Sequence, residues 1–138
     1  MKAQFVMFLA AGLFWLMPAS TTAQNSETMK TFDPTFTHTV FFWLHNPDSA
    51  EDRSAFEASL RKFLSRSAFA KTNFIGTPPV ATRGVVDGSF TYSLIVTFAS
   101  PEDQAAYQSE QPHLDFIAES EHLWSRVIVY DSMGLPEN

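Results

Sequence analysis

The chain has 138 residues, of which 45% are hydrophobic, and its 14 phenylalanines supply enough apolar surface for one compact core. The formal net charge is −6 and no basic cluster occurs, which excludes the nucleic-acid-binding proteins that need positive charge to neutralise phosphates. The chain contains no cysteine, which excludes a disulfide scaffold, a thiolate nucleophile and a cysteine-ligated metal site.

The first residues have the pattern of a secretion signal. Lys2 is the only charged residue before Glu27, and an apolar run covers residues 5–17. This run has the length of a signal-peptide core and is too short to cross a membrane comfortably. Cleavage after Ala23 would remove a signal peptide of residues 1–23, whereas an uncleaved membrane anchor is the alternative. We therefore expect an exported protein, periplasmic or secreted, that keeps no membrane contact after cleavage.

The first strand and helix of the domain follow a polar segment, residues 24–35, which is predicted to be a linker. The segment from His38 to Leu44 is rich in β-branched and aromatic residues, which predicts a strand with two apolar faces. Ser49 is a candidate N-cap for a helix that ends near residues 65–68. Apolar residues at helical spacing form the predicted buried face of that helix: Phe56, Leu60, Phe63 and Leu64.

Two further strands and a helix are predicted in the middle of the chain. Prolines directly after residues 74–76 predict a short, irregular strand at the edge of a sheet. Residues 90–98 alternate apolar and polar side chains and predict a regular strand. Ser100 followed by Pro101 is typical of a helix start, and this helix should end near Glu110.

Pro112 interrupts that helix, and a second helical stretch is predicted to follow it. Residues 127–130 are predicted to form the last strand, before a polar tail of residues 133–138. The element order is β-α-β-β-α-β, the ferredoxin-like pattern of an α+β domain. Helices on one face would leave the other, partly apolar face of the sheet bare. We therefore expect a second copy to cover it, so that two sheets pair into a dimeric α/β barrel.

Four pieces of sequence point to a family in the same order and spacing. They are HTVFFWL from His38, YSLIVTF from Tyr92, AYQ from Ala106 with PH at Pro112, and HLWSRVIVYD from His122. Together they span residues 36–132, the expected domain, which resembles the stress-responsive A/B barrel (Dabb) family. The resemblance implies a homodimer without a cofactor and a small cavity in each protomer, between the sheet and the helices.

The resemblance also implies candidate catalytic residues. Plant cyclases of this family close a linear polyketide by aldol-type condensation, using a tyrosine and a histidine six residues later. Tyr107 and His113 stand at these positions, and His38 matches a pocket-lining histidine of the first strand. The family usually has proline two residues before the later histidine, whereas here Pro112 directly precedes His113. This departure leaves the direction of the His113 side chain open.

The candidate residues suit proton transfer, and each also has a structural interpretation. A neutral histidine can remove a proton from an acidic carbon, and a tyrosine hydroxyl can stabilise the resulting enolate. Alternatively, Tyr107 packs in the core, His113 caps a helix, and His38 is a buried histidine bonded to a backbone carbonyl. His45 and His122 are expected in solvent and at a helix end. No histidines are spaced as a metal site, so no metal is expected.

Aromatic side chains are the candidates for an apolar ligand pocket, with core or dimer interface as the alternative. The candidate ligand-binding residues are Phe42, Tyr92, Phe116 and Trp124. Three functions follow from the sequence: a homodimer that binds a small apolar or aromatic ligand, a cofactor-free cyclase-like or lyase enzyme, and a structural stress-related protein without a ligand site. A continuous cavity reached by Tyr107 and His113 would favour the first two.

Overall fold

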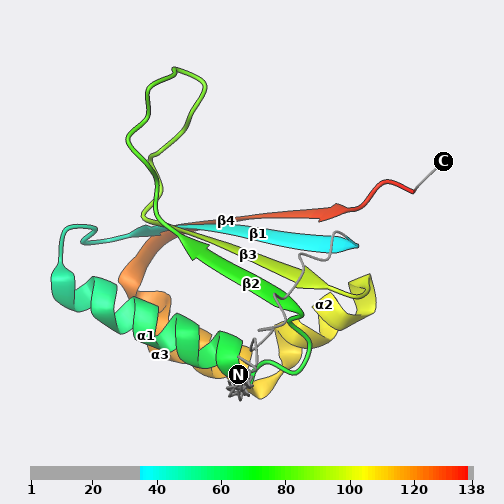
Figure 1. The fold of residues 1–138 in the computed structure, drawn as a ribbon. Helices are drawn as coiled ribbons and strands as arrows, with labels where there is room; N and C mark the ends of the chain where they lie inside the picture. Colours follow the sequence, from blue (N-terminus) through cyan, green and yellow to red (C-terminus); the bar gives the residue numbers. More distant parts are fainter. Residues whose placement is uncertain (1–34, 137–138) are drawn as a thin grey trace, which may run out of the picture.

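The computed structural model describes residues 35–136, so the expected signal peptide and all but the last residue of the expected linker lie outside the described residues. The described chain forms one antiparallel sheet of four strands with its helices on one face (Figure 1). The elements in chain order are β1 (Phe36–Leu44), α1 (Ala50–Arg66), β2 (Thr72–Gly76), β3 (Tyr92–Phe98), α2 (Pro101–Ser109), α3 (Gln111–Ser120), the short 3-10 helix η1 (Glu121–Leu123) and β4 (Trp124–Met133). The predicted α+β, ferredoxin-like fold is confirmed.

The strands lie in the order β2-β3-β1-β4, so β1 and β3 are central and β2 is an edge strand, as its prolines predicted. β4, at the other edge, is longer than the predicted strand of residues 127–130. It pairs with β1 along its whole length, from Trp124 opposite Leu44 to Met133 opposite Phe36. The length of β4 therefore follows from its pairing with β1 and could not be predicted from the local sequence of β4 alone.

Side-chain caps explain where two of the helices begin. Ser49 accepts a hydrogen bond from the backbone N–H of Asp52 at the start of α1 (3.2 Å). Ser100 accepts one from the backbone N–H of Asp103 at the start of α2 (3.1 Å), with Pro101 at the first helical position. Each bond satisfies one of the N–H groups that a helix start leaves without a partner.

A break between α2 and α3 changes the direction of the chain. Glu110 has an extended backbone (φ −69°, ψ 149°) and is both the last cap of α2 and the first cap of α3. Pro112 lies in the first turn of α3, where the missing N–H of proline costs nothing. The break places the residues before and after it on two differently directed helices.

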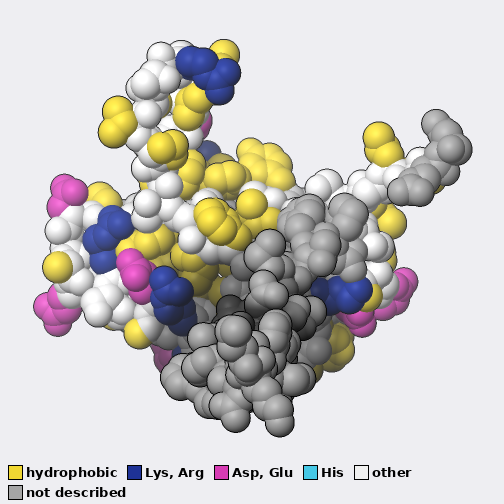
Figure 2. All heavy atoms as spheres, viewed as in Figure 1, with side chains coloured by type: hydrophobic (Ala, Val, Ile, Leu, Met, Phe, Trp, Pro, Cys, Tyr) yellow, Lys and Arg dark blue, Asp and Glu magenta, His cyan; other side chains and the backbone are white. Residues whose placement is uncertain are grey.

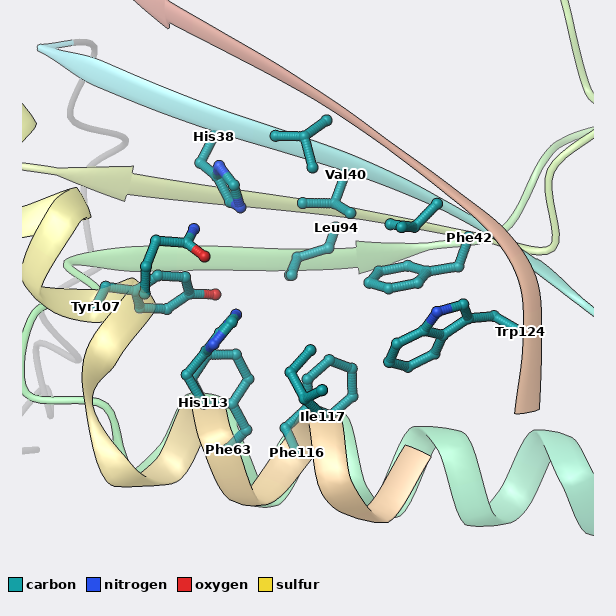
Figure 3. A pocket seen from close by; sticks show the side chains of 13 residues that line it. His38, Val40, Phe42, Phe63, Leu94, Tyr107, His113, Phe116, Ile117 and Trp124 are labelled. Atoms are coloured by element: carbon teal, nitrogen blue, oxygen red, sulfur yellow. The ribbon is translucent and has the colours of Figure 1, made fainter. Parts of the chain in front are cut away.

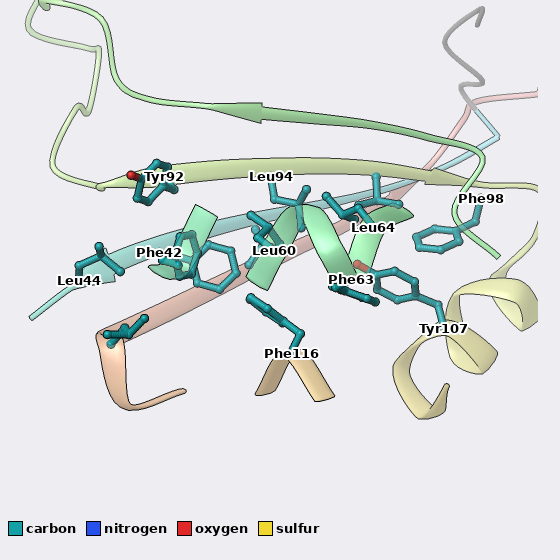
Figure 4. Packing of buried hydrophobic residues seen from close by; sticks show 14 of the residues in the cluster. Phe42, Leu44, Leu60, Phe63, Leu64, Tyr92, Leu94, Phe98, Tyr107 and Phe116 are labelled. Carbon is teal, nitrogen blue, oxygen red and sulfur yellow. The ribbon is translucent and has the colours of Figure 1, made fainter. Parts of the chain in front are cut away.

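The core lies between the sheet and the helices, and aromatic rings dominate it (Figure 4). On β1 every second side chain is buried, from Phe36 to Leu44, and these side chains face α1 and α3. Phe56 and Leu60 of α1 are fully buried against them, and Phe116 contributes from α3. Burying one such side chain stabilises the fold by roughly 1.5–3 kcal/mol, so this layer fixes the helices on the sheet.

The opposite face of the sheet has no helix over it in the described part of the chain. The loop of residues 77–91 rises from this side (Figure 1), and Figure 2 shows hydrophobic side chains gathered at its base. Phe41 contacts Phe90 with ring centroids 4.8 Å apart, and Tyr130 next to it is 61% exposed. The sequence predicted that this bare face of the sheet would be partly apolar, and its exposed apolar part is aromatic.

Candidate functional site

A cavity of about 170 Å³ lies between the sheet and helices α2 and α3 (Figure 3). Its walls come from both central strands, the edge strand β4 and all three helices. The lining residues are His38, Val40, Phe42, Phe63, Leu94, Tyr107, Gln108, His113, Phe116, Ile117, Trp124, Val127 and Val129. Val127 and Val129 on β4 are 44% and 45% exposed. The cavity therefore reaches solvent along the β4 edge of the sheet.

Three polar side chains converge at one end of this cavity. His38 points down from β1, the hydroxyl of Tyr107 points in from α2, and His113 points up from α3 (Figure 3). The ring centroid of Tyr107 lies 5.9 Å from that of His38 and 5.4 Å from that of His113. Although Pro112 directly precedes it, His113 faces the cavity. The structure thus brings together the three residues singled out as catalytic candidates.

His38 is held by a carboxylate. The ring is 5% exposed, and its Nδ1 lies 2.6 Å from Oδ1 of Asp131, the residue directly opposite on β4. A carboxylate only accepts hydrogen bonds, so Nδ1 carries the proton in this pair. The partner expected for a buried His38, a backbone carbonyl, is replaced here by Asp131. Sequence reasoning missed Asp131 because the predicted last strand ended one residue before it.

Tyr107 keeps its proton. The side chain is 1% exposed and packs between Phe63 (ring centroids 5.0 Å apart) and Phe98 (4.9 Å). Burial raises the pKa of the Tyr107 hydroxyl well above its ordinary value, and the negative charge of Glu110 raises it further. Its hydroxyl is therefore a hydrogen-bond donor at any pH near neutrality.

His113 is kept neutral. Burial lowers its pKa below the ordinary value of 6.5, and the nearby His38 lowers it further. Glu110 and the backbone carbonyl of Gln108 act in the opposite direction, although the Gln108 carbonyl makes no hydrogen bond of good geometry with the ring. Within residues 35–136, the buried Nδ1 of His113 has no hydrogen-bond partner. A neutral imidazole facing a cavity can accept a proton.

The other end of the cavity is aromatic. The ring centroid of Trp124 lies 5.4 Å from that of Phe42 and 5.5 Å from that of Phe116. These are three of the four residues expected to bind a ligand. Tyr92, the fourth, does not line the cavity: its ring stacks on Phe56 (4.9 Å) and its hydroxyl donates a hydrogen bond to Oε1 of Glu57 (2.6 Å).

The Tyr92 contact is structural, and it shows why sequence position did not separate lining residues from core. Burial and the hydrogen bond to Glu57 raise the pKa of Tyr92 to about 12. Tyr92 and Phe42 are directly opposite each other on β3 and β1, on the same face of the sheet. Only the positions of α1 and α3 decide which of them borders empty space. The lining residues that the sequence analysis did not single out as ligand-binding are Val40, Phe63, Leu94, Gln108, Ile117, Val127 and Val129.

The types of side chain that line the cavity limit which ligands it can bind. No lysine or arginine is among the described residues that line it. A ligand carboxylate or phosphate would lose its hydration there without gaining an ion pair, which is costly. The site therefore favours an uncharged molecule with a polar group at one end and an apolar body at the other.

The remaining candidates lie away from this cavity. His45 and His122 are exposed and do not line it. Among residues 35–136, no group of three or more acidic or histidine side chains is placed to hold a metal ion. In the same part of the chain, no helix has both the length and the apolar character that crossing a membrane requires.

A second hollow, of about 270 Å³, lies on the opposite face of the sheet. The guanidinium of Arg126 stacks 4.5 Å above the ring of Trp43, and the indole N–H of Trp43 donates to Ser89 in the 77–91 loop (3.2 Å). Phe41, Trp43 and Phe90 thus belong to this face and do not line the cavity under the helices. The residues around the hollow are Phe41, Trp43, Asp87, Phe90, Arg126, Ile128 and Tyr130.

Comparison with known proteins places the chain in a family. Residues 36–133 match the model of the family described as Stress responsive A/B Barrel Domain. No curated protein matches the chain. Similar solved structures include a hydroxynitrile lyase from Passiflora edulis, with 21% identity, a TM-score of 0.63 and coverage of 77% of this chain and 99% of that one.

Two further structures share the fold. A Dabb family protein with a ferredoxin-like fold from Mesorhizobium loti has 16% identity, a TM-score of 0.62 and coverage of 75% of this chain and 100% of that one. A dimeric ferredoxin-like protein from Thermobifida fusca has 13% identity, a TM-score of 0.59 and coverage of 75% and 94%. At these identities the structures show a common fold, and the family match covers most of the chain. The chain belongs to the stress responsive A/B barrel domain family, as the resemblance in its sequence predicted.

Proposed function

We propose that the cavity binds a small, uncharged molecule with an apolar or aromatic body, and that His113 removes a proton from it without a cofactor. One observation carries this proposal: two imidazoles and a phenol converge at one end of a cavity whose other lining residues, apart from Gln108, are apolar or aromatic. The aromatic end would hold the body of the ligand and so place its reacting group beside His113.

The proton transfer follows from the protonation states of the two residues. Nε2 of His113 would accept a proton from the carbon next to a carbonyl group, and the electron pair of the broken C–H bond would move to the carbonyl oxygen. The Tyr107 hydroxyl would donate a hydrogen bond to the enolate oxygen that forms. The lowered pKa of His113 keeps the base unprotonated, and the raised pKa of Tyr107 keeps the donor protonated. Aldol-type cyclases use such a step, and so do lyases whose reaction passes through an enolate.

Deuterium exchange tests this proposal directly. Phenylacetone, an uncharged aryl ketone, would be incubated in D2O with the protein, and loss of its α-proton signals followed by NMR. We expect the wild type to accelerate exchange, and His113→Ala to lose about 100-fold of the acceleration. His122→Ala is the matched control, since His122 is an exposed histidine outside the cavity, and it should exchange as the wild type does.

A ligand-binding protein without catalysis is the second candidate, supported by the aromatic end formed by Phe42, Phe116 and Trp124. The two candidates differ in one result of the same experiment. Saturation-transfer NMR would show phenylacetone bound in both cases. Binding without accelerated exchange would leave a binding protein, whereas absence of binding by phenylacetone and by related aryl aldehydes would contradict both candidates.

We infer that two copies pair through the helix-free face of the sheet. The support is the aromatic surface of Phe41, Trp43 and Tyr130 on that face, together with the dimeric state given for the Thermobifida fusca neighbour. Two such sheets would pack about 10 Å apart and remove these rings from water. The cavity under the helices, on the other face of each sheet, would stay accessible in this dimer.

We also propose that the protein is exported after loss of residues 1–23. The support is the charge and apolar pattern of the N-terminal sequence. Expression of the full chain in a bacterium, followed by N-terminal sequencing of the periplasmic and medium fractions, tests this proposal. A mature protein that begins at Gln24 is expected, and a full-length chain retained in the membrane fraction would contradict it.

A further inference from the structure

Two buried polar atoms beside the cavity lack hydrogen-bond partners within the described part of the chain: Oε1 of Glu110 and Nδ1 of His113. Buried polar groups nearly always have a hydrogen-bond partner, so two such atoms without one at the start of α3 need an explanation. The negative charge of Glu110 acts on both His113 and Tyr107, which places it close to the reacting end of the cavity.

Local backbone geometry keeps Glu110 and His113 close in space. Glu110 is the N-cap of α3 and His113 is three residues later, and the backbone N–H of His113 donates to the Glu110 carbonyl (3.1 Å). The other carboxylate oxygen, Oε2, accepts the backbone N–H of Ala68 after α1 (3.0 Å), so the Glu110 side chain is tied in place and does not cap α3.

We propose that Glu110 is a positioning residue for His113: its free Oε1 accepts the proton on Nδ1 of His113, directly after a small rotation or through one bridging water molecule. The two orphan atoms would then satisfy each other. With the proton fixed on Nδ1, the lone pair of Nε2 faces the cavity, where the proposed reaction needs a base.

The other groups around His113 agree with this tautomer. The backbone carbonyl of Gln108, which raises the pKa of His113, can likewise only accept a hydrogen bond. His38 on β1 has its own Nδ1 engaged by Asp131, and Tyr107 on α2 retains its hydroxyl proton. The Tyr107 hydroxyl oxygen is a neutral acceptor that points into the cavity, whereas the charged carboxylate of Glu110 is the stronger acceptor. The charge of Glu110 also opposes the lowering of the His113 pKa by burial, which keeps the imidazole a useful base.

The inference rests on the proposed role of His113, but its test reads the imidazole itself and needs no substrate. Two-dimensional NMR of 15N-labelled histidine would report which ring nitrogen carries the proton and how each ring titrates. In the wild type we expect His113 to be the Nδ1–H tautomer. A wild-type His113 with its proton on Nε2 would overturn the inference without any variant.

Glu110→Gln removes the charge and keeps an amide oxygen that can still accept the Ala68 N–H. We expect the pKa of His113 to fall further and a mixture of tautomers to appear. Glu119→Gln is the matched control: it removes the same charge from α3, where Glu119 contacts Lys62 and Ser59 away from the cavity. Its His113 should titrate as in the wild type. Identical titrations in the two variants would overturn the inference.

The same variants separate this inference from the proposed function. If phenylacetone exchange is catalysed, Glu110→Gln should slow it roughly tenfold with little change in KM, because Glu110 acts through the base and does not touch the ligand. If the tautomer and titration depend on Glu110 but the wild type catalyses no exchange, the contact between Glu110 and His113 stands and the proposed catalysis fails.

Discussion

Burial changes the proton affinity of the cavity residues in opposite directions. It lowers the pKa of His113 and raises that of Tyr107, because in each case it disfavours the charged form. Both side chains are therefore neutral near pH 7, one as an acceptor and the other as a donor. Asp131 accepts a hydrogen bond from Nδ1 of His38, and the negative charge of Glu110 opposes the lowering of the His113 pKa.

The protonation state of His113 should determine how the rate of the proposed exchange reaction depends on pH. The base is active when unprotonated, so the rate should be constant at neutral pH and fall as the pH drops through the pKa of His113. Since that pKa lies below 6.5, the fall should be centred below pH 6.5. A pH–rate profile of kcat/KM checks this. A midpoint at or above 6.5 would mean that His113 is not the buried neutral base described here.

At the scale of elements, the caps and the α2–α3 break place the functional side chains. Local pattern was enough to predict β1, α1 and β3, because alternation and capping are encoded within each segment. It was not enough for β4, whose ends depend on pairing with β1. Asp131 was therefore not identified as the partner of His38, because it lies beyond the predicted end of this strand. Tyr107 and His113 were candidates only through family resemblance, since their convergence depends on how two helices are directed.

Within α1, the cap makes a measurable contribution. Ser49→Ala removes the acceptor for the backbone N–H of Asp52, and we expect a loss of about 1 kcal/mol in the free energy of unfolding. Ser54→Ala is the control, since Ser54 is exposed in the second turn of the same helix and alanine favours helix there. Urea unfolding followed by circular dichroism measures both. Equal stability of the two variants would show that the cap is not needed.

At the scale of the whole molecule, the two faces of the sheet carry different features. One face carries the core and the cavity, and the other carries an aromatic surface below the 77–91 loop. Because side chains alternate along β4, Val129 belongs to the cavity face and its neighbour Ile128 to the open face. The sequence predicted this division, but the cavity volume depends on how closely the helices approach the sheet.

That alternation provides a test of dimer formation. Ile128→Asp places a charge on the open face, and we expect sedimentation velocity to show a monomer where the wild type is a dimer. Val129→Asp adds the same charge one residue away on the cavity face and should remain dimeric. A monomeric wild type, or an Ile128→Asp variant that is still dimeric, would contradict pairing through this face.

A crystal structure of the mature protein soaked with phenylacetone would show whether the cavity holds an uncharged ketone in the orientation that proton transfer needs. We expect the phenyl ring to lie among Phe42, Phe116 and Trp124, with the carbonyl oxygen within about 3.2 Å of the Tyr107 hydroxyl and the α-carbon facing Nε2 of His113. Ligand bound only at the open-face hollow beside Arg126, or a cavity that stays empty at saturating ligand, would contradict this expectation.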